Sequence, residues 1–299
     1  MSGDSNKINQ IARQEGWRTA AEISASKSDN PSYQLEYITS EARADFRFLL
    51  PITKNDIILD VCGGWGNMTT AFARTCKHVF TLDTSQGKLE FVKIRASQEG
   101  LTNITFIQSR PSEIPLPFDS CHIALLTDTL ECEYWCNITP QSQNNHSQVL
   151  HAIWQRLVPG GCLYISVENR FSYQYILGRR FPPSNLRFIT LLPTSVAKLY
   201  SRLFRGADYQ DITYTLTGIK KSLKAVGFSK LDLFFPIPTY PNFRFLTDFK
   251  SQDATDFMIS RLRLHSGFSN SVYFFSKIVS AIGILQWVTP GFSVVAYKE

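Results

Sequence analysis

A glycine-rich turn that follows an acidic residue could hold a cofactor in this chain. Asp60 stands near the end of a short apolar run, and glycines follow at Gly63, Gly64 and Gly66. Glycines let the backbone bend sharply and approach a ligand without a Cβ atom in the way. A second acid, Asp83, ends the next apolar run 23 residues after Asp60. An acid at that point can accept hydrogen bonds from both ribose hydroxyls, so the pattern predicts a site for a cofactor that carries a ribose.

Two other interpretations of the turn have to be weighed. A lone glycine such as Gly63 is most simply a tight strand-to-helix connection, and only its combination with the two acids points to a cofactor. A nicotinamide cofactor is a rival, since its pattern G-x-G-x-x-G places a pyrophosphate at a helix N-terminus. No third glycine follows Gly66 at that spacing.

The elements that must position these residues are short apolar runs alternating with helical segments. Continuous apolar runs of this kind are typical of a parallel sheet buried on both faces. We therefore expect a doubly wound α/β core. The expected strands are 56–61, 78–83, 103–108, 121–127 and 162–168, and the expected helices between them are 68–75, 87–99 and 147–157.

The flanks of this core differ from it in pattern. Residues 6–50 predict two helices with a break at Asn30 and Pro31. A long segment rich in Arg, Tyr and Phe, 169–212, is typical of a functional insertion. Further on, we expect a helix over 217–225 that ends at Gly227, strands over 230–236 and 292–297, an irregular segment over 237–270, and a buried rather than membrane-spanning helix over 272–288. The expected parts are a helical flank (1–50), a cofactor-binding core (51–170), a substrate lid (171–215) and the remaining sheet with a second insertion (216–299).

The stretch from Asp60 to Gly66 resembles the first motif of the Rossmann-like, class I S-adenosylmethionine-dependent methyltransferases, and the resemblance covers about residues 40–170. It implies a seven-stranded, mostly parallel sheet with N-terminal helices and a lid after the fifth strand. In such a family Asp60 would hold the methionine amino group, Gly64 and Gly66 would admit the cofactor, and Asp83 would bind the ribose. S-adenosylmethionine is then the expected cofactor and S-adenosylhomocysteine the product. The full set expected at the cofactor is Asp60, Cys62, Gly63, Gly64, Gly66, Asp83, Thr84, Arg110, Ser112 and Asp128.

The sequence departs from the family pattern at two positions. Cys62 stands where the first glycine of the motif is usual, and Arg110 stands where an acid often contacts the adenine amino group. Backbone groups or Ser112 could serve the adenine edge instead. The run 125–131 is similar to the small-molecule branch and lacks the Asn/Asp-Pro-Pro-Tyr/Phe signature of many enzymes that methylate bases. Glu131 and Glu133 are best explained as surface acids of a helix.

Residues that follow the fifth strand would face the acceptor, because ligands bind at the carboxyl ends of strands in open α/β sheets. Glu168 is the candidate general base and Arg170 the candidate anchor for an acidic group, although the two could simply pair with each other or cap the lid. His146 is a second catalytic candidate because it is expected in a loop, whereas His151 is expected within a helix. Tyr173 and Tyr175 are expected to bind substrate. Aromatic side chains that could form a pocket wall or lid core are Phe171, Tyr173, Tyr175, Phe181, Tyr209 and Tyr214.

Composition narrows the class of protein further. With 43% hydrophobic and 19% charged residues, the 299-residue chain is expected to be globular. Its net charge of +6 comes from scattered basic pairs rather than a tract, and nucleic acid is not the expected partner. Cysteines without a CxxC pair indicate reduced thiols, so we expect a cytoplasmic protein without stable membrane insertion. No cluster has metal-ligand spacing and Asp128 alone does not argue for magnesium, so no metal is expected.

These observations favour O-methylation of a small molecule, a saccharide or a peptide-derived natural product. N-methylation of a small amine or peptide is an alternative, and a cofactor-binding partner protein without activity is another. The fold does not identify the acceptor or the atom methylated, because proteins with one fold can carry different active sites. The sequence does not indicate the oligomeric state.

Overall fold

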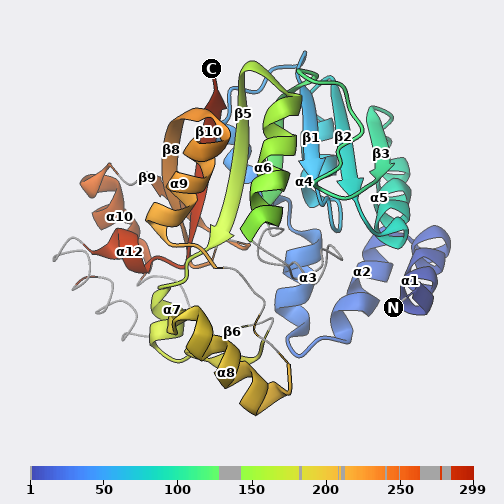
Figure 1. Cartoon of the computed structure of the whole chain (residues 1–299). Helices are drawn as coiled ribbons and strands as arrows, with labels where there is room; N and C mark the ends of the chain where they lie inside the picture. The colour runs from blue at the N-terminus through green and yellow to red at the C-terminus, as the bar shows by residue number, and fades with distance from the viewer. Residues whose placement is uncertain are drawn as a thin grey trace.

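The computed structural model describes residues 2–127, 143–181, 184–207, 209, 213–239, 241–248, 250–262, 277 and 284–299. Its centre is one large sheet with the strand order β3-β2-β1-β4-β5-β10-β8-β9 (Figure 1). The strands are β1 (Ile57–Val61), β2 (His78–Asp83), β3 (Ile104–Gln108), β4 (Cys121–Thr127), β5 (Leu157–Glu168), β8 (Phe228–Ile237), β9 (Phe245–Asp248) and β10 (Gly291–Lys298).

The first five strands of the sheet run parallel, and β10 is antiparallel to both of its neighbours, β5 and β8. The expected doubly wound α/β architecture is therefore confirmed. The expected number of seven strands is wrong by one, because β9 adds an antiparallel edge strand to β8. This strand lies inside the segment 237–270, which was expected to be irregular because a four-residue edge strand is too short to show a period in sequence.

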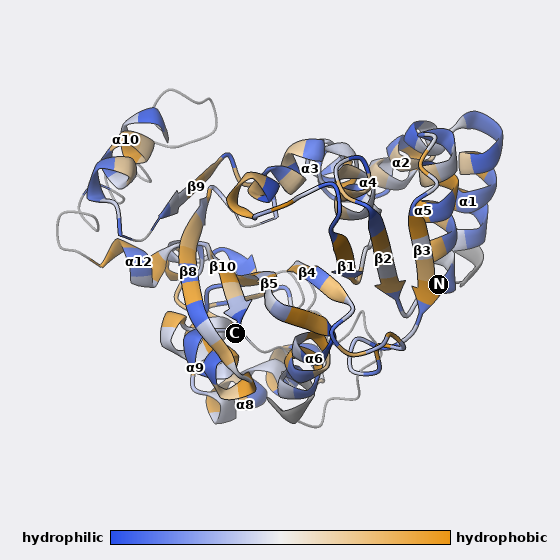
Figure 2. Cartoon of the chain, turned by 90° about the horizontal axis from the view of Figure 1, so that it is seen from above, coloured by the Kyte–Doolittle hydropathy of each residue, from blue (hydrophilic) through white to orange (hydrophobic). Residues whose placement is uncertain are grey.

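Helices cover both faces of the sheet, as the view from above shows (Figure 2). The helices are α1 (Ser2–Glu15), α2 (Trp17–Ser26), α3 (Pro31–Thr39), the 3-10 helix η1 (Glu41–Leu49), α4 (Asn67–Ala73), α5 (Gln86–Gln98), α6 (Gln143–Arg156), α7 (Tyr173–Ile176), the 3-10 helix η2 (Ile189–Leu191), α8 (Thr194–Arg205), α9 (Leu216–Val226), α10 (Gln252–Leu262) and α12 (Leu285–Val288). A small hairpin of β6 (Arg180–Phe181) and β7 (Leu186–Arg187) precedes η2.

Successive side chains of the central strands point to opposite faces of the sheet and pack into two separate cores, one on each face. Leu59 packs with Leu150 of α6 and Ile219 of α9 on one face. Ile58, the preceding residue, packs with Phe72 of α4 on the other face. Burial of a side chain of this size contributes about 1.5–3 kcal/mol. Filled cores on both faces hold the carboxyl ends of the strands in a fixed array.

The N-terminal helices form a third core against α5. Trp17, Ala21 and Ile38 pack there with Phe91 of α5. The expected two helices over 6–50 are in fact three helices and a 3-10 helix, with an additional break at Gly16, whose φ is 101°. The expected break at residues 30–31 is confirmed, because the Asn30 side chain caps α3 by accepting from the Tyr33 amide.

The segment after β5 carries α7, the β6–β7 hairpin, η2 and α8, with Tyr175, Phe181 and Ile189 in its own small core. The helix expected over 272–288 lies mostly outside the described residues. In the described part of the chain, no helix combines the length and apolarity that a membrane span requires.

Candidate cofactor and acceptor site

The turn between β1 and α4 uses left-handed backbone at three positions. Cys62 has a φ of 62°, Gly64 of 54° and Gly66 of 82°. The amides of Cys62 and Gly63 donate to the carbonyl of Leu82 over 2.7 and 3.3 Å, which binds the turn to the end of β2. Cys62 therefore occupies a conformation that favours glycine, and this is the position where the sequence departs from the family motif.

Gly63 is required for a different reason, namely close packing. A Cβ atom there would lie 2.3 Å from Thr81 Oγ1 and 3.0 Å from Thr69 Oγ1. Gly64 is the opposite case, because a Cβ atom there would meet only the Cys62 carbonyl at 3.8 Å. Open space in front of Gly64 fits a ligand that approaches the backbone, whereas Gly63 is closed by the protein itself.

Asp60 lies in a buried polar cluster at the end of β1. Its Oδ2 accepts a 2.5 Å hydrogen bond from the Thr69 hydroxyl, and the Thr69 and Thr81 hydroxyl oxygens are 3.1 Å apart. The Asp60 side chain is 1% exposed. Burial raises the pKa of this carboxyl to about 6, the hydrogen bond from Thr69 opposes the rise, and the negative charge of Asp83 adds to it. A cationic ligand group would stabilise the ionised form of Asp60 here.

Asp83 ends β2 next to this cluster. Its Oδ1 accepts a 2.8 Å hydrogen bond from the Ser85 amide, and Ser85 in turn caps α5. The Asp83 residue is only 3% exposed. The two carboxylates thus stand at the ends of neighbouring strands, and Val61 of β1 is in register with Leu82 of β2. This pair fits a ligand with an amino group near Asp60 and ribose hydroxyls near Asp83, as S-adenosylmethionine has.

Arg43 of η1 is a residue of this site that sequence reasoning missed. It is 7% exposed, and it donates to the carbonyls of Pro241 and Tyr37 over 2.8 and 3.0 Å. Its positive charge acts to lower the pKa of Asp60. Arg43 lies in the N-terminal flank, outside any motif spacing, so no local signal could have identified it.

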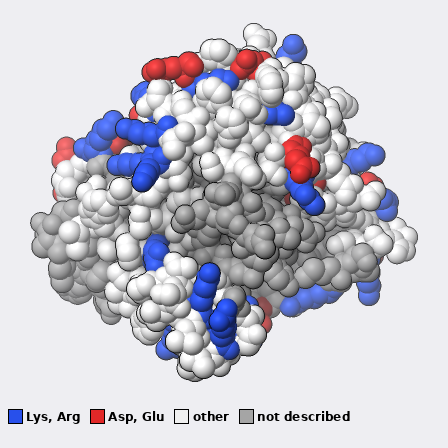
Figure 3. Space-filling view, viewed as in Figure 1, with Lys and Arg blue, Asp and Glu red and all other residues white. Residues whose placement is uncertain are grey.

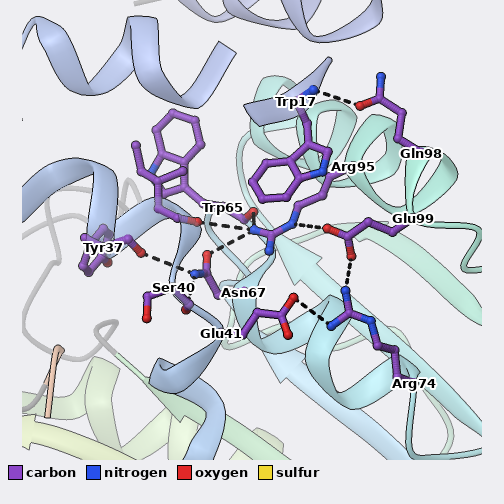
Figure 4. A network of polar contacts seen from close by, with 11 residues as sticks. Trp17, Tyr37, Ser40, Glu41, Trp65, Asn67, Arg74, Arg95, Gln98 and Glu99 are labelled. Carbon is purple, nitrogen blue, oxygen red and sulfur yellow. Dashed lines mark hydrogen bonds and ion pairs between the residues drawn. The ribbon is translucent and has the colours of Figure 1, made fainter. Parts of the chain in front are cut away.

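A buried arginine supports the glycine turn from behind (Figure 4). Arg95 of α5 is fully buried, and it donates to the carbonyl of Trp65 over 3.0 Å and to the carbonyl of Ile38 over 3.4 Å. Its guanidinium also stacks 3.9 Å from the ring of Trp17 and pairs with Glu99 over 3.0 Å. Through these contacts one side chain joins the turn, α3 and the start of α2.

The loop after β3, which carries Arg110 and Ser112, is more exposed than the turns after β1 and β2. Arg110 and Glu113 form a 3.6 Å ion pair with side chains 64% and 67% exposed. Ser112 is half-buried, and the carbonyl of Thr84 accepts a 3.3 Å hydrogen bond from Gln108. In the family an acid often contacts the adenine amino group from this loop. Among the described residues of the loop, none is a buried Asp or Glu. The cofactor-binding roles of Arg110, Ser112 and Thr84 stay predictions, and Asp128 lies outside the described residues.

Glu168 stands at the carboxyl end of β5, on the same edge of the sheet as Asp60 and Asp83. The hydroxyl of Tyr175 donates a short hydrogen bond to Glu168 Oε1. Arg170 turns away from this pair, since its guanidinium donates to the carbonyl of Leu192. Glu168 and Arg170 thus each bond to a residue of the segment after β5, Tyr175 and Leu192, rather than to each other.

The aromatic residues after β5 are mainly packed into the protein. Tyr175, Phe181 and Tyr209 belong to the small core below α8, and Tyr173 is 6% exposed. Burial raises the pKa of the Tyr173 phenol. Tyr214 packs in the main core. The sixth candidate, Phe171, is 41% exposed, so a role in packing accounts for five of the six residues.

His146 is not in a loop, and that expectation is wrong. It lies in α6, is 4% exposed, and its Nδ1 is 2.8 Å from the Tyr214 hydroxyl. The polar run before it did not show where the helix begins, because helix starts are poorly marked without an apolar period. His151 lies in the same helix, as expected, with Nε2 3.1 Å from Gln155 Nε2. Among the described residues, no group of three or more His, Cys, Asp or Glu side chains could hold a metal ion.

Part of the chain is similar in sequence to known methyltransferases. Residues 58–161, from β1 to the start of β5, match the model of a methyltransferase domain. A curated relative, named cobalt-precorrin-6B C(15)-methyltransferase (decarboxylating), from Methanocaldococcus jannaschii, is 28% identical over 99 residues. That match covers 32% of this chain and 52% of the relative, so the chain spans about half the length of the curated relative it matches.

Solved structures share the fold over most of the chain. Phosphoethanolamine N-methyltransferase 1 of Haemonchus contortus has a TM-score of 0.51 at 13% identity, covering 96% of this chain and 49% of its own. A SAM-dependent methyltransferase of Thermotoga maritima has a TM-score of 0.50 at 12% identity, with 90% and 95% coverage. The [4+2]-cyclase SpnF has a TM-score of 0.50 at 14% identity, with 86% and 80% coverage.

The domain match, the doubly wound sheet and the glycine turn between two acids agree with one another. Residues 58–161 are therefore similar to a methyltransferase domain, and the sheet that contains them has the fold of the Rossmann-like methyltransferases.

Proposed function

We propose that this protein transfers the methyl group of S-adenosylmethionine to an oxygen atom of a small molecule, a saccharide or a peptide-derived natural product. The observation that carries the proposal is the Glu168 carboxylate, half-buried at the carboxyl end of β5 and oriented by the Tyr175 hydroxyl. A positioned carboxylate beside the crevice of an open α/β sheet can accept the proton of an acceptor hydroxyl.

The register of the sheet supports this division of roles. Asp60 is level with Leu125 of β4, and Leu125 is level with Tyr164 of β5. Two strand spacings separate β1 from β5 by about 10 Å. Glu168 lies four residues beyond Tyr164, which adds about 13 Å along the strand. The backbone positions of Asp60 and Glu168 are therefore about 10 Å apart across the sheet and about 13 Å apart along the strands, which supports a cofactor near Asp60 and an acceptor near Glu168.

Each group would have a limited task. When bound, the cofactor supplies an electrophilic methyl group on a sulfonium, and in-line displacement then depends mainly on alignment. Asp60 would bind the amino group, Asp83 the ribose hydroxyls, and the backbone at Gly64 would allow close approach. Glu168 would orient the acceptor hydroxyl and receive its proton, while Tyr175 holds the carboxylate in place.

Calorimetry with S-adenosylmethionine and, separately, with NADH tests the cofactor. Micromolar binding of S-adenosylmethionine alone is expected, and binding of neither or only of NADH overturns the proposal. A screen of hydroxyl, carboxylate and amine acceptors with radiolabelled cofactor then tests the reaction. Labelling of amines alone would replace O-methylation by N-methylation, and binding without turnover would favour the non-catalytic alternative.

The base is tested by substitution of Glu168. Glu168→Gln keeps the shape and the Tyr175 contact, so turnover is expected to fall about 100-fold or more while the cofactor Kd stays unchanged. Tyr175→Phe should lower turnover less, because only the orientation of Glu168 is affected. Glu22→Gln, an exposed substitution on α2, is the matched control. Full activity of Glu168→Gln would show that another group takes the proton.

A further inference from the structure

Exposed apolar side chains gather on the segment that follows β5. Among the residues that the structure describes, thirteen large hydrophobic side chains are exposed, and eight of them lie between residues 171 and 204. These eight are Phe171, Ile176, Leu177, Phe188, Val196, Leu199, Leu203 and Phe204. Exposed apolar side chains are normally scattered singly, so this concentration marks an interaction surface.

Helix α8 carries the most exposed part of that surface. Its inner side is formed by Ala197 and Ser201, both fully buried. On the opposite side Leu199 is 58% and Leu203 is 73% exposed. Residues spaced by three and four positions share one face of a helix, so Val196, three positions before Leu199, extends the same stripe. The helix thus presents an apolar stripe away from the protein.

The charged side chains of residues 169–207 are all basic. Residues 169–207 contain seven Lys or Arg residues and no Asp or Glu. Six of the seven are exposed, namely Arg179, Arg180, Arg187, Lys198, Arg202 and Arg205. Figure 3 shows basic side chains at the α8 end of the molecule, at the bottom of the view. An apolar stripe bordered by cations is the pattern of a helix that lies in the interface of a membrane.

We propose that residues 169–207, with α8 as the contact helix, dock on the surface of an anionic lipid bilayer. The apolar stripe would enter the boundary between headgroups and acyl chains, while the exposed Lys and Arg side chains would pair with lipid phosphates. A bilayer of this kind matches both properties of the surface at once. This inference concerns the location of the protein at a membrane surface, and it does not depend on the identity of the methyl acceptor.

Other occupants match the surface less well. A second copy of the chain across a two-fold axis would place the same cations opposite one another with no acid in the segment to neutralise them. A nucleic acid or another soluble polyanion would match the cations and leave Leu199 and Leu203 in water. The bilayer accounts for the aliphatic and the charged side chains together.

The placement of α8 suits contact with a surface rather than insertion. The helix has 12 residues, about 18 Å of helix length, which is too short to cross a hydrocarbon core of about 30 Å. It lies beyond the carboxyl end of β5, whose arrow points toward α7 and α8 in Figure 1. Docking through α8 would therefore turn the edge of the sheet that carries Glu168 toward the membrane.

Vesicle co-sedimentation of the full chain tests the proposal. We expect binding to vesicles of phosphatidylcholine with about one-third phosphatidylglycerol, and at least tenfold weaker binding to phosphatidylcholine alone. Binding to the mixed vesicles should weaken as salt rises, since exposed charges are screened. No binding to the mixed vesicles overturns the proposal.

Two pairs of variants separate the apolar and the charged contributions. Leu199→Ser with Leu203→Ser, and separately Lys198→Gln with Arg205→Gln, should each lower binding at least tenfold, while unfolding temperature stays unchanged because these side chains are exposed. The matched controls are Phe257→Ser on α10, 56% exposed, and Lys7→Gln with Lys54→Gln.

Three further results would overturn the inference. Vesicle binding that survives both pairs of variants would place the membrane contact elsewhere. Binding to a soluble polyanion such as heparin that matches vesicle binding and ignores the serine variant would assign the surface to polyanions. A dimer in sedimentation velocity that dissociates in the serine variant would assign the stripe to self-association.

Discussion

The Thr69 hydroxyl donates a 2.5 Å hydrogen bond to the Asp60 carboxylate and so ties α4 to the end of β1 behind the glycine turn. The carboxylate that it holds is 1% exposed, and its pKa is raised to about 6 chiefly by burial. Ionisation of Asp60 in the absence of a ligand therefore lowers the stability of the folded state. A cationic ligand group offsets that cost, and this links pH, stability and cofactor binding at one side chain.

Asp60→Asn should change how stability depends on pH. The pKa of Asp60 is raised from 3.8 to about 6 in the folded chain, so the native state binds a proton more tightly than the unfolded state. That stabilisation is fully present below about pH 3.8 and is lost as pH rises through about 6. Urea unfolding should show the variant gaining about 3 kcal/mol relative to wild type between about pH 4 and about pH 8. A constant difference would mean that Asp60 titrates normally.

Cofactor affinity of the wild type should follow the same titration. Binding of an ammonium group favours ionised Asp60, so affinity is expected to fall as pH drops through about 6. Calorimetry in buffers of different ionisation enthalpy would detect the released proton. In Asp60→Asn this pH dependence should vanish and affinity should be weak at every pH. An unchanged pH profile in the variant would assign it to another group.

Asp83→Ala should weaken binding of S-adenosylmethionine by more than tenfold. The variant removes the buried carboxylate at the end of β2 that is proposed to accept hydrogen bonds from the ribose hydroxyls. The Ser85 amide loses its partner as well, so the start of α5 should be slightly less stable. Asp29→Ala, an exposed acid on the N-terminal side of α3, serves as the control. Unchanged affinity in calorimetry would remove Asp83 from the ribose site.

Gly63→Ala should destabilise the protein by about 1–3 kcal/mol, since a Cβ atom would lie 2.3 Å from Thr81 Oγ1. Thr81→Ala removes that oxygen. The double variant should therefore be more stable than the sum of the two single effects predicts, and denaturant unfolding of all four proteins measures the coupling. Additive effects would show that the contact with Thr81 is not what excludes a side chain at position 63.

Arg95→Met should cost about 2–3 kcal/mol, because it leaves the carbonyl of Trp65 without its buried donor. Glu99 keeps its 2.7 Å ion pair with Arg74, which limits the loss. The matched control is Arg18→Met, an exposed arginine stacked 4.6 Å from the same Trp17 ring, which should cost less than about 0.5 kcal/mol. Loosening of the turn should also weaken cofactor binding, and equal effects of the two variants would contradict a supporting role for Arg95.

What the sequence by itself determined is the local and periodic part of this protein. Apolar runs alternating with helices predicted the doubly wound core, and the cap at Gly227 and the break before Pro31 were correct because each depends on neighbouring residues. The acid and glycine pattern from Asp60 to Gly66 predicted the turn, since backbone conformation is set by the residues within it.

Only the tertiary structure decided which distant side chains meet. The charge of Arg43 lowers the pKa of Asp60, and Arg95 donates to the carbonyl of Trp65. The Thr81 hydroxyl leaves no room for a side chain at Gly63. These contacts form because strands and helices far apart in the chain pack together. Burial decided the pKa of Asp60 as well, because solvent exclusion depends on every element around the carboxyl. The exposed stripe of α8 follows the same rule, since its composition is visible in the sequence but the face that the protein covers is chosen by packing.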